Sequence, residues 1–184
     1  MPRIPTARHP QVPSARWRST AAAKFTHLLA TATLVAGTAH AQLVDNPDWQ
    51  ESAVPPPPAY DVKRALQIEM PAYMTLKFGI DPKTIVITPD GVVRYVVLGW
   101  REGGGTVNAF YEGVRCATAE YKTYARSADG AWRLVDNPDW KRIDERNSIY
   151  TYELSRQALC RGRAPRASVT DMVRELKRPE ILLN

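Results

Sequence analysis

The stretch DGVVRYVVLGWREGGGTVNAFYEGVRC, Asp90 to Cys116, decides the fold of this chain. Its first half is apolar on both faces at a spacing of two residues: Val92, Val96, Leu98 and Trp100 share one face, and Val93, Tyr95 and Val97 share the other. A strand that is apolar on both faces is typical of the interior of a sheet covered on both sides. The glycines at 103–105 then predict a turn, and a second strand returns to Cys116. The stretch therefore predicts a long central hairpin.

A symmetric loop over residues 101–105 would fix the register of this hairpin. It places Trp100 opposite Thr106 and Arg94 opposite Glu112. Opposite charges directly across a ladder stabilise a sheet by roughly 0.2–1 kcal/mol. A half-buried arginine also needs an acceptor, because an unpaired buried charge is costly. We therefore predict a structural ion pair between Arg94 and Glu112.

Shorter elements surround the central hairpin. Pro89-Asp90-Gly91 predicts a tight turn that leads from a strand at 84–88 into Val92. Period-two patterns predict further strands at 73–80, 120–126 and 131–135, and helical patterns occur at 148–160 and from 168 onwards. Together they predict an α+β fold, with a curved, mainly antiparallel sheet of about five to seven strands and two C-terminal helices.

Residues 1–41 have the pattern of a secretory signal peptide. They carry five basic residues and no acid, then the apolar run Phe25 to Ala36 and the A-x-A cleavage site that ends at Ala41. The run is too short for a transmembrane helix. We therefore expect cleavage between Ala41 and Gln42, a periplasmic location, and no transmembrane segment in the mature chain. The alternative is a buried N-terminal helix.

The expected mature chain divides into a Pro-rich linker over 42–60 and a single α+β domain over 61–184. Val54 to Ala59, VPPPPA, predicts a stiff polyproline spacer. Five of the 25 basic residues and none of the 19 acids precede Gln42, so 20 basic and 19 acidic residues remain after it. The basic character therefore belongs to the leader and gives no support for a nucleic-acid partner.

The distribution of histidines limits the chemistry of the mature chain. All three histidines, His9, His27 and His40, lie in the leader. Ser-His-Asp and Cys-His catalysis as usually built therefore do not apply, and the commonest transition-metal ligand is missing. We predict no cofactor and no metal site. Carboxylate chemistry stays open, because a glycosidase needs only two suitably spaced acids.

Cys116 and Cys160 are the two cysteines of the chain. Export implies an oxidising compartment, in which two cysteines allow one intramolecular pairing. A redox or nucleophilic thiol is the alternative, but the chain has no C-x-x-C motif, and no histidine after the leader to activate a thiolate. We therefore predict a structural disulfide between Cys116 and Cys160.

The heptapeptide LVDNPDW occurs twice, at Leu43 to Trp49 and at Leu134 to Trp140. The simpler interpretation is an Asx-Pro turn with a tryptophan anchor, used twice. The alternative is a paired surface, with two acids and an indole in each copy, that holds a sugar ring or a cation.

Three motifs carry a family resemblance: DGVVRY at 90–95, YEGVRC at 111–116 and EYKTYA at 120–125. They are followed by Trp132, Trp140 and Cys160. Over roughly Asp48 to Cys160 the chain resembles the cryptic neisserial protein family, small exported proteins of Gram-negative bacteria. The resemblance implies export and one compact domain. It implies no activity, substrate or site residue.

We therefore predict a periplasmic protein that binds or supports another envelope component, a protein or a cell-wall polymer, without catalysis. The candidate contact residues are Trp100, Tyr111, Tyr121 and Trp140, although core packing explains each of them as well. The alternative is a carboxylate-dependent hydrolase that acts on cell-wall glycan. An exposed apolar patch would favour the binding protein, and an open groove with two facing acids would favour the hydrolase.

Overall fold

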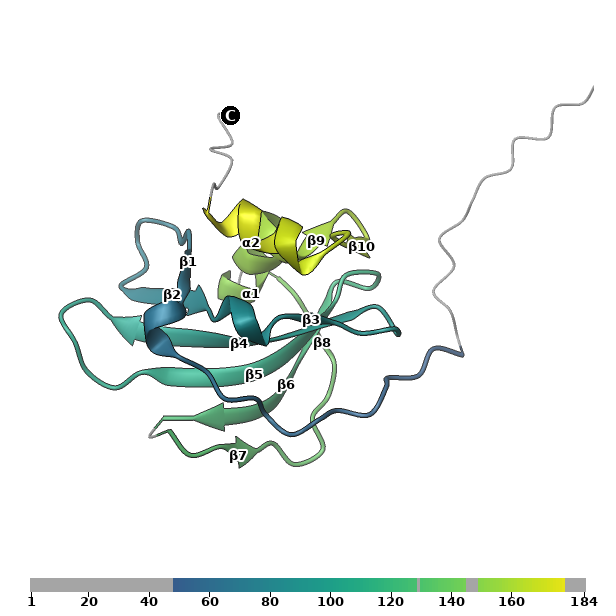
Figure 1. Ribbon diagram of the computed structural model, residues 1–184, viewed down its shortest axis with the longest axis horizontal. Helices are drawn as coiled ribbons and strands as arrows, with labels where there is room; N and C mark the ends of the chain where they lie inside the picture. The colour runs from purple at the N-terminus through teal and green to yellow at the C-terminus, as the bar shows by residue number, and fades with distance from the viewer. Residues whose placement is uncertain (1–47, 129, 145–148, 178–184) are drawn as a thin grey trace, which may run out of the picture. The chain divides into compact units, whose positions relative to one another are not determined.

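The computed structural model describes residues 48–128, 130–144 and 149–177 (Figure 1). The expected signal peptide, its cleavage site between Ala41 and Gln42, and the start of the expected linker lie outside these residues. Export therefore stays a prediction. Within the described ranges, no helix combines the length and the apolar character needed to span a membrane.

An eight-stranded, antiparallel sheet forms the centre of the described fold, which confirms the α+β prediction. The strand order is β1-β2-β4-β5-β6-β7, with β3 paired to β4 and β8 paired to β6. The count exceeds the expected five to seven strands because three of the eight have only two residues each. The strands are β1 (Leu66–Ile68), β2 (Leu76–Ile80), β3 (Val86–Ile87), β4 (Val92–Arg101), β5 (Asn108–Arg115), β6 (Glu120–Ser127), β7 (Arg133–Leu134) and β8 (Lys141–Arg142).

Strand β4 is buried on both faces over residues 92–99, as its sequence predicts. Val93, Tyr95 and Val97 join a core cluster with the helices. Val96 and Leu98 join a second cluster on the other face. We call these the helix face and the second face of the sheet. The double burial explains the apolar residues at both alternations.

The predicted register of the central hairpin is wrong by one residue. Arg94 lies opposite Gly113, and Glu112 lies opposite Tyr95. The last pair of this ladder is Gly99 with Asn108, so an even number of residues, 100–107, separates the paired positions in place of the odd number assumed, and the parity of the pairing changes. Because side chains alternate along a strand, the shift puts Arg94 and Glu112 on opposite faces of the sheet. The predicted ion pair between these two residues therefore does not form.

Two helices near the C-terminus cover the helix face, as expected (Figure 1). Helix α1 (Ile149–Leu154) continues as a π-helix over Ser155–Leu159. A short hairpin of β9 (Cys160–Arg161) and β10 (Ala164–Pro165) follows. Helix α2 (Val169–Lys177) begins after Ser168, whose Oγ accepts a hydrogen bond from the backbone N–H of Asp171 at 3.1 Å. This hydrogen bond caps the N-terminus of α2.

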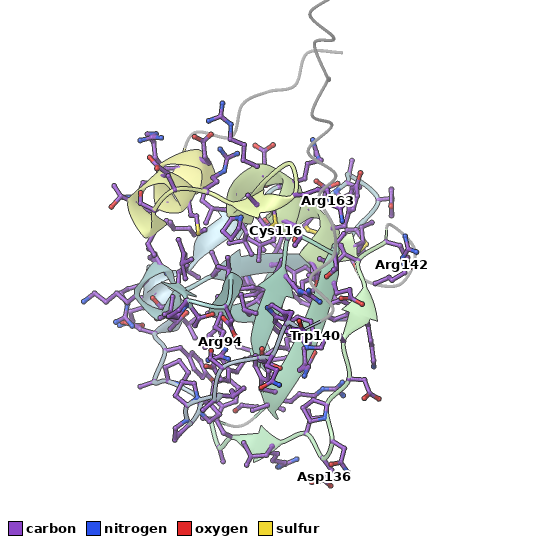
Figure 2. The ribbon with its side chains drawn as sticks, turned by 90° about the vertical axis from the view of Figure 1, so that its right-hand side faces the viewer. Arg94, Cys116, Asp136, Trp140, Arg142 and Arg163 are labelled. Atoms are coloured by element: carbon purple, nitrogen blue, oxygen red, sulfur yellow. A yellow bond between two sulfur atoms is a disulfide. The ribbon has the colours of Figure 1, made fainter. Side chains whose placement is uncertain are left out.

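The predicted disulfide is confirmed. Cys116 follows the end of β5 and Cys160 follows the π-helix, and their Cα atoms lie 5.7 Å apart. The bond therefore ties the central hairpin covalently to the helical layer. Figure 2 shows Cys116 beside the helices, whereas Arg94 and Trp140 lie farther along the sheet.

Candidate binding groove

Residues 49–57, here called the strap, lie against the second face of the sheet. The buried guanidinium of Arg94 donates hydrogen bonds to the carbonyl oxygens of Ser52 at 2.7 Å and Ala53 at 3.0 Å. The backbone N–H of Ser52 donates to a carboxylate oxygen of Asp90 at 2.6 Å. Over these residues, the segment expected to be a linker is packed on the domain.

Glu51 supplies the carboxylate that the sequence assigned to Glu112. Its side chain lies 3.6 Å from the guanidinium of Arg94 and 2.7 Å from Lys122 Nζ. It also accepts a hydrogen bond of 2.5 Å from the hydroxyl of Tyr124. Burial, and next the hydrogen bond to Glu51, raise the pKa of Tyr124, so this phenol stays a neutral donor. The buried charge of Arg94 is thus compensated by the strap.

Burial tends to raise the pKa of Asp90 as well, but hydrogen bonds reverse the effect. Thr88 and the backbone N–H of Ser52 donate to its carboxylate and lower its pKa to about 2. Asp90 therefore stays ionised in the turn before β4. Its backbone carbonyl also accepts a hydrogen bond of 2.8 Å from the indole of Trp49, which holds the start of the strap.

The tryptophans that end the two LVDNPDW copies meet in space. Trp49 and Trp140 pack edge to face, with ring centroids 5.8 Å apart. The guanidinium of Arg115 lies 3.9 Å from the centroid of Trp49, and Lys122 Nζ lies 4.9 Å from that of Trp140. Because cations of the chain itself contact both rings, this arrangement favours the tryptophan-anchor interpretation over a sugar-binding pair.

An apolar groove of about 370 Å³ opens between the strap and β7. Leu134 and Val54 on its rim have exposed fractions of 71% and 41%, so apolar side chains face solvent here. None of the residues that line the groove carries a carboxylate. They are Val54, Pro55, Pro56 and Pro57 from the strap, Tyr111 and Tyr124 from the sheet, and Leu134, Val135 and Pro138 from β7 and the segment after it.

A β-bulge builds the aromatic floor of the groove. The ladder between β5 and β6 shifts between Tyr111 and Glu112, so that Tyr124 and Ala125 both join the second-face cluster. The rings of Tyr111 and Tyr124 then lie 5.2 Å apart. Gly113 makes room for this packing, because a Cβ there would collide with the hydroxyl of Tyr124. The groove floor therefore depends on an irregularity of the ladder.

The structure does not gather the four predicted contact residues on one surface. Tyr111 lines the groove at 3% exposure. Trp100 packs on the same face outside the groove, Trp140 contacts Trp49, and Tyr121 packs against the helix-face cluster. The sequence prediction missed Leu134, whose exposure in the two-residue edge strand β7 is visible only in the structure.

Glu112 is fully buried on the helix face, away from the groove. It accepts hydrogen bonds from the hydroxyls of Tyr150 at 2.7 Å, Thr123 at 3.0 Å and Tyr95 at 3.3 Å. Burial raises the pKa of Glu112 to about 7, although these three bonds oppose the rise. In the described ranges, no three His, Cys, Asp or Glu side chains come together as a metal site.

Comparison with known proteins gives one match. The model of the CNP1-like family matches residues 44–177, which include the strap, the groove and the disulfide. No curated protein and no solved structure matches the chain significantly. Because the family match covers well over half of the 184 residues, this chain belongs to the CNP1-like family.

Proposed function

We propose that this protein is an exported, non-catalytic binding protein of the cell envelope. We further propose that the groove between the strap and β7 holds an extended apolar segment of an envelope protein. The observation that carries the proposal is the exposed apolar groove itself, lined by tyrosines, prolines and aliphatic side chains and by no carboxylate. Exposed apolar surface of this kind is typical of interaction sites.

The two walls of the groove favour an extended peptide as its occupant. One wall contains three consecutive prolines, Pro55 to Pro57, which offer no backbone N–H and so recognise a partner by apolar contact. The other wall belongs to β7, which ends the strand order of the sheet. An edge strand can accept an added strand through its backbone, while alternate side chains of the peptide enter pockets.

The described acids give no support to the alternative of a carboxylate-dependent hydrolase. Such an enzyme needs two carboxyl groups that face each other across an open site. Glu112 is enclosed by hydroxyls on the helix face, and Glu51 binds Lys122 and Tyr124 on the second face. The hydrolase therefore stays a prediction that no observed geometry favours.

Site-specific photo-crosslinking in a Gram-negative host tests the proposal. A photoreactive residue at Leu134, on the rim of the groove, should form adducts with an envelope protein, and the attachment point should map to an extended apolar segment. The matched control is Tyr73, which has an exposed fraction of 74% but does not line the groove. We expect no such adduct from Tyr73.

A second variant shows whether the groove carries the contact. Val54→Asp places a charge on the exposed rim and should abolish the adducts from position 134, because burying an unpaired carboxylate is costly. Identical adducts from positions 134 and 73, or adducts that survive Val54→Asp, would reject the groove as the site. Adducts to glycan instead of protein would reject the peptide as the occupant.

A further inference from the structure

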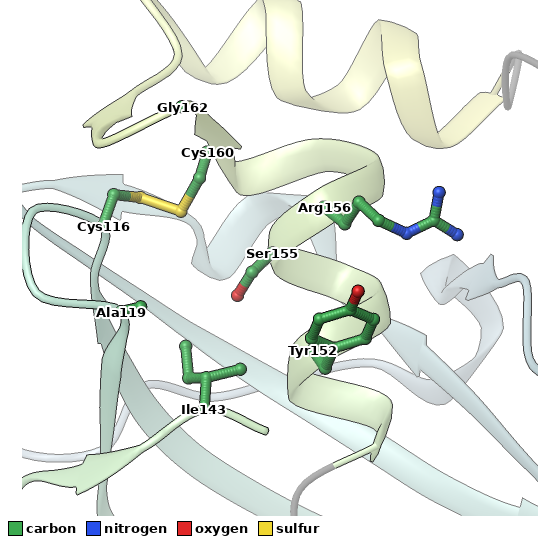
Figure 3. Close-up of a pocket in the computed structure, with 8 residues that line it drawn as sticks. All are labelled: Cys116, Ala119, Ile143, Tyr152, Ser155, Arg156, Cys160 and Gly162. Atoms are coloured by element: carbon green, nitrogen blue, oxygen red, sulfur yellow. A yellow bond between two sulfur atoms is a disulfide. The ribbon is translucent and has the colours of Figure 1, made fainter. Parts of the chain in front are cut away.

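A second pocket lies on the helix face, beside the disulfide (Figure 3). Its volume is about 320 Å³, at the lower end of the range for small-molecule sites. It shares no residue with the groove. Its lining consists of Cys116, Ala119, Ile143, Tyr152, Ser155, Arg156, Cys160 and Gly162.

Ser155 presents an unpartnered hydroxyl to this pocket. The residue has an exposed fraction of 8%, and its Oγ is buried without a hydrogen-bond partner in the described structure. Figure 3 shows the side chain directed toward the space between the disulfide and Ile143. Buried polar atoms nearly always have a partner, so the hydroxyl of Ser155 is available for a hydrogen bond to a molecule that occupies this pocket.

The backbone at Ser155 is also unusual. The π-helix begins at this residue, and the carbonyl oxygen of Ser155 accepts a hydrogen bond from the backbone N–H of Cys160. Such π turns are rare and occur frequently at functional sites. The disulfide holds Cys160, the residue after the π-helix, to the sheet. The wall that carries the hydroxyl is therefore fixed before any ligand arrives.

The charge of the lining selects the class of ligand. Arg156 contributes the one charged side chain among the described lining residues, and none of them is acidic. Its guanidinium pairs with Glu153 at 2.7 Å, is 44% exposed, and is directed away from Ser155 in Figure 3. Ile143, Ala119 and the disulfide supply apolar surface in the interior. The combination suits a molecule with an apolar chain and one acceptor group for the hydroxyl of Ser155, and no acid in the lining repels a carboxylate there.

We propose that this pocket binds one small aliphatic carboxylic acid. The Oγ–H of Ser155 donates to a carboxylate oxygen, and the aliphatic chain packs on Ile143 and the disulfide. This site lies outside the groove and does not depend on the function proposed for it.

Titration calorimetry with octanoate, and with octanol as the uncharged analogue, tests the assignment on the oxidised full-length chain. We expect saturable binding of octanoate and binding of octanol at least tenfold weaker. Ser155→Ala should weaken the binding of octanoate at least tenfold, because a hydrogen bond to a charged group is lost. The same variant should keep or raise the melting temperature, since it removes an unsatisfied buried hydroxyl.

Ser127→Ala is the matched control. Ser127 Oγ is also buried and unpartnered, but it lies on β6 outside the pocket. Octanoate should bind this variant as it binds the original chain. If octanoate binding does not saturate, or if the Ser155→Ala and Ser127→Ala variants bind octanoate equally well, the assignment is overturned. Water is then the partner of Ser155.

Discussion

Substituting Glu112 with glutamine should remove a defined part of the pH dependence of stability. The carboxyl group is fully buried, its pKa is about 7, and the ordinary value is 4.5. Hydroxyls of Tyr95, Thr123 and Tyr150 face it, and Arg126 contributes a favourable charge. Burial dominates, so the folded state holds the proton more tightly than the unfolded state does.

The sign and size of the effect follow from this difference. Stability from the neutral acid is fully present below about pH 4.5, is lost as the pH rises toward 7, and stays lost above it. At about 1.36 kcal/mol per pH unit, the difference between 4.5 and about 7 corresponds to about 3 kcal/mol. Glutamine stays neutral and keeps an acceptor oxygen for the hydroxyls, so Glu112→Gln should not show this loss.

Urea unfolding, followed by tryptophan fluorescence between about pH 5 and pH 8, measures the prediction. The difference in unfolding free energy between Glu112→Gln and the original chain should change by roughly 2–3 kcal/mol over this range, because part of the titration lies below it. The three histidines precede residue 42 and are common to both chains, so they cancel in the comparison. Glu102→Gln is the control, because that side chain is 83% exposed. Parallel pH curves for the original chain and Glu112→Gln would refute the reasoning.

Three further variants have expected costs in unfolding free energy. Replacing Cys116 and Cys160 together by serine should cost about 4 kcal/mol in urea unfolding, since the bond closes a separation of 44 residues; a cost below about 1 kcal/mol would contradict the entropic account. Gly113→Ala should cost roughly 1–3 kcal/mol, because its Cβ displaces the hydroxyl of Tyr124, and an unchanged melting temperature would disprove the contact. Ser168→Ala should cost about 1 kcal/mol by removing the cap of α2, measured by circular dichroism, and no change would argue against that cap.

The features that the sequence predicts correctly are those with local signals. The turn at 89–91 needs a residue with positive φ, and Gly91 has a φ of 82°. The helical pattern from residue 168 onwards lies within one short segment, and α2 occupies Val169–Lys177. The pairing of Cys116 with Cys160 could be predicted without knowing the fold, since two cysteines allow one intramolecular bond.

The register error shows what local patterns cannot determine. The apolar residues of β4 occupy both faces, so its pattern does not select one register of the hairpin. The choice then rested on the loop, where Gly103 to Gly105 all adopt positive φ and permit several lengths. The symmetric loop over residues 101–105 has odd length, and it was favoured because it pairs the opposite charges of Arg94 and Glu112. The observed loop has even length, and each of the two residues found other partners.

Those partners have a consequence for the groove. Arg94 is 3% exposed, and the acceptors of its two terminal NH2 groups, from Glu51 to Ala53, come from the strap. Detaching the strap would break these buried hydrogen bonds and the ion pair with Glu51 together, whereas an exposed ion pair contributes little. Pro55 to Pro57, which line the groove, begin two residues after Ala53, so these contacts fix the point from which the proline wall extends. The strap wall of the groove is therefore in place before a peptide binds, so binding does not carry the entropic cost of ordering that wall.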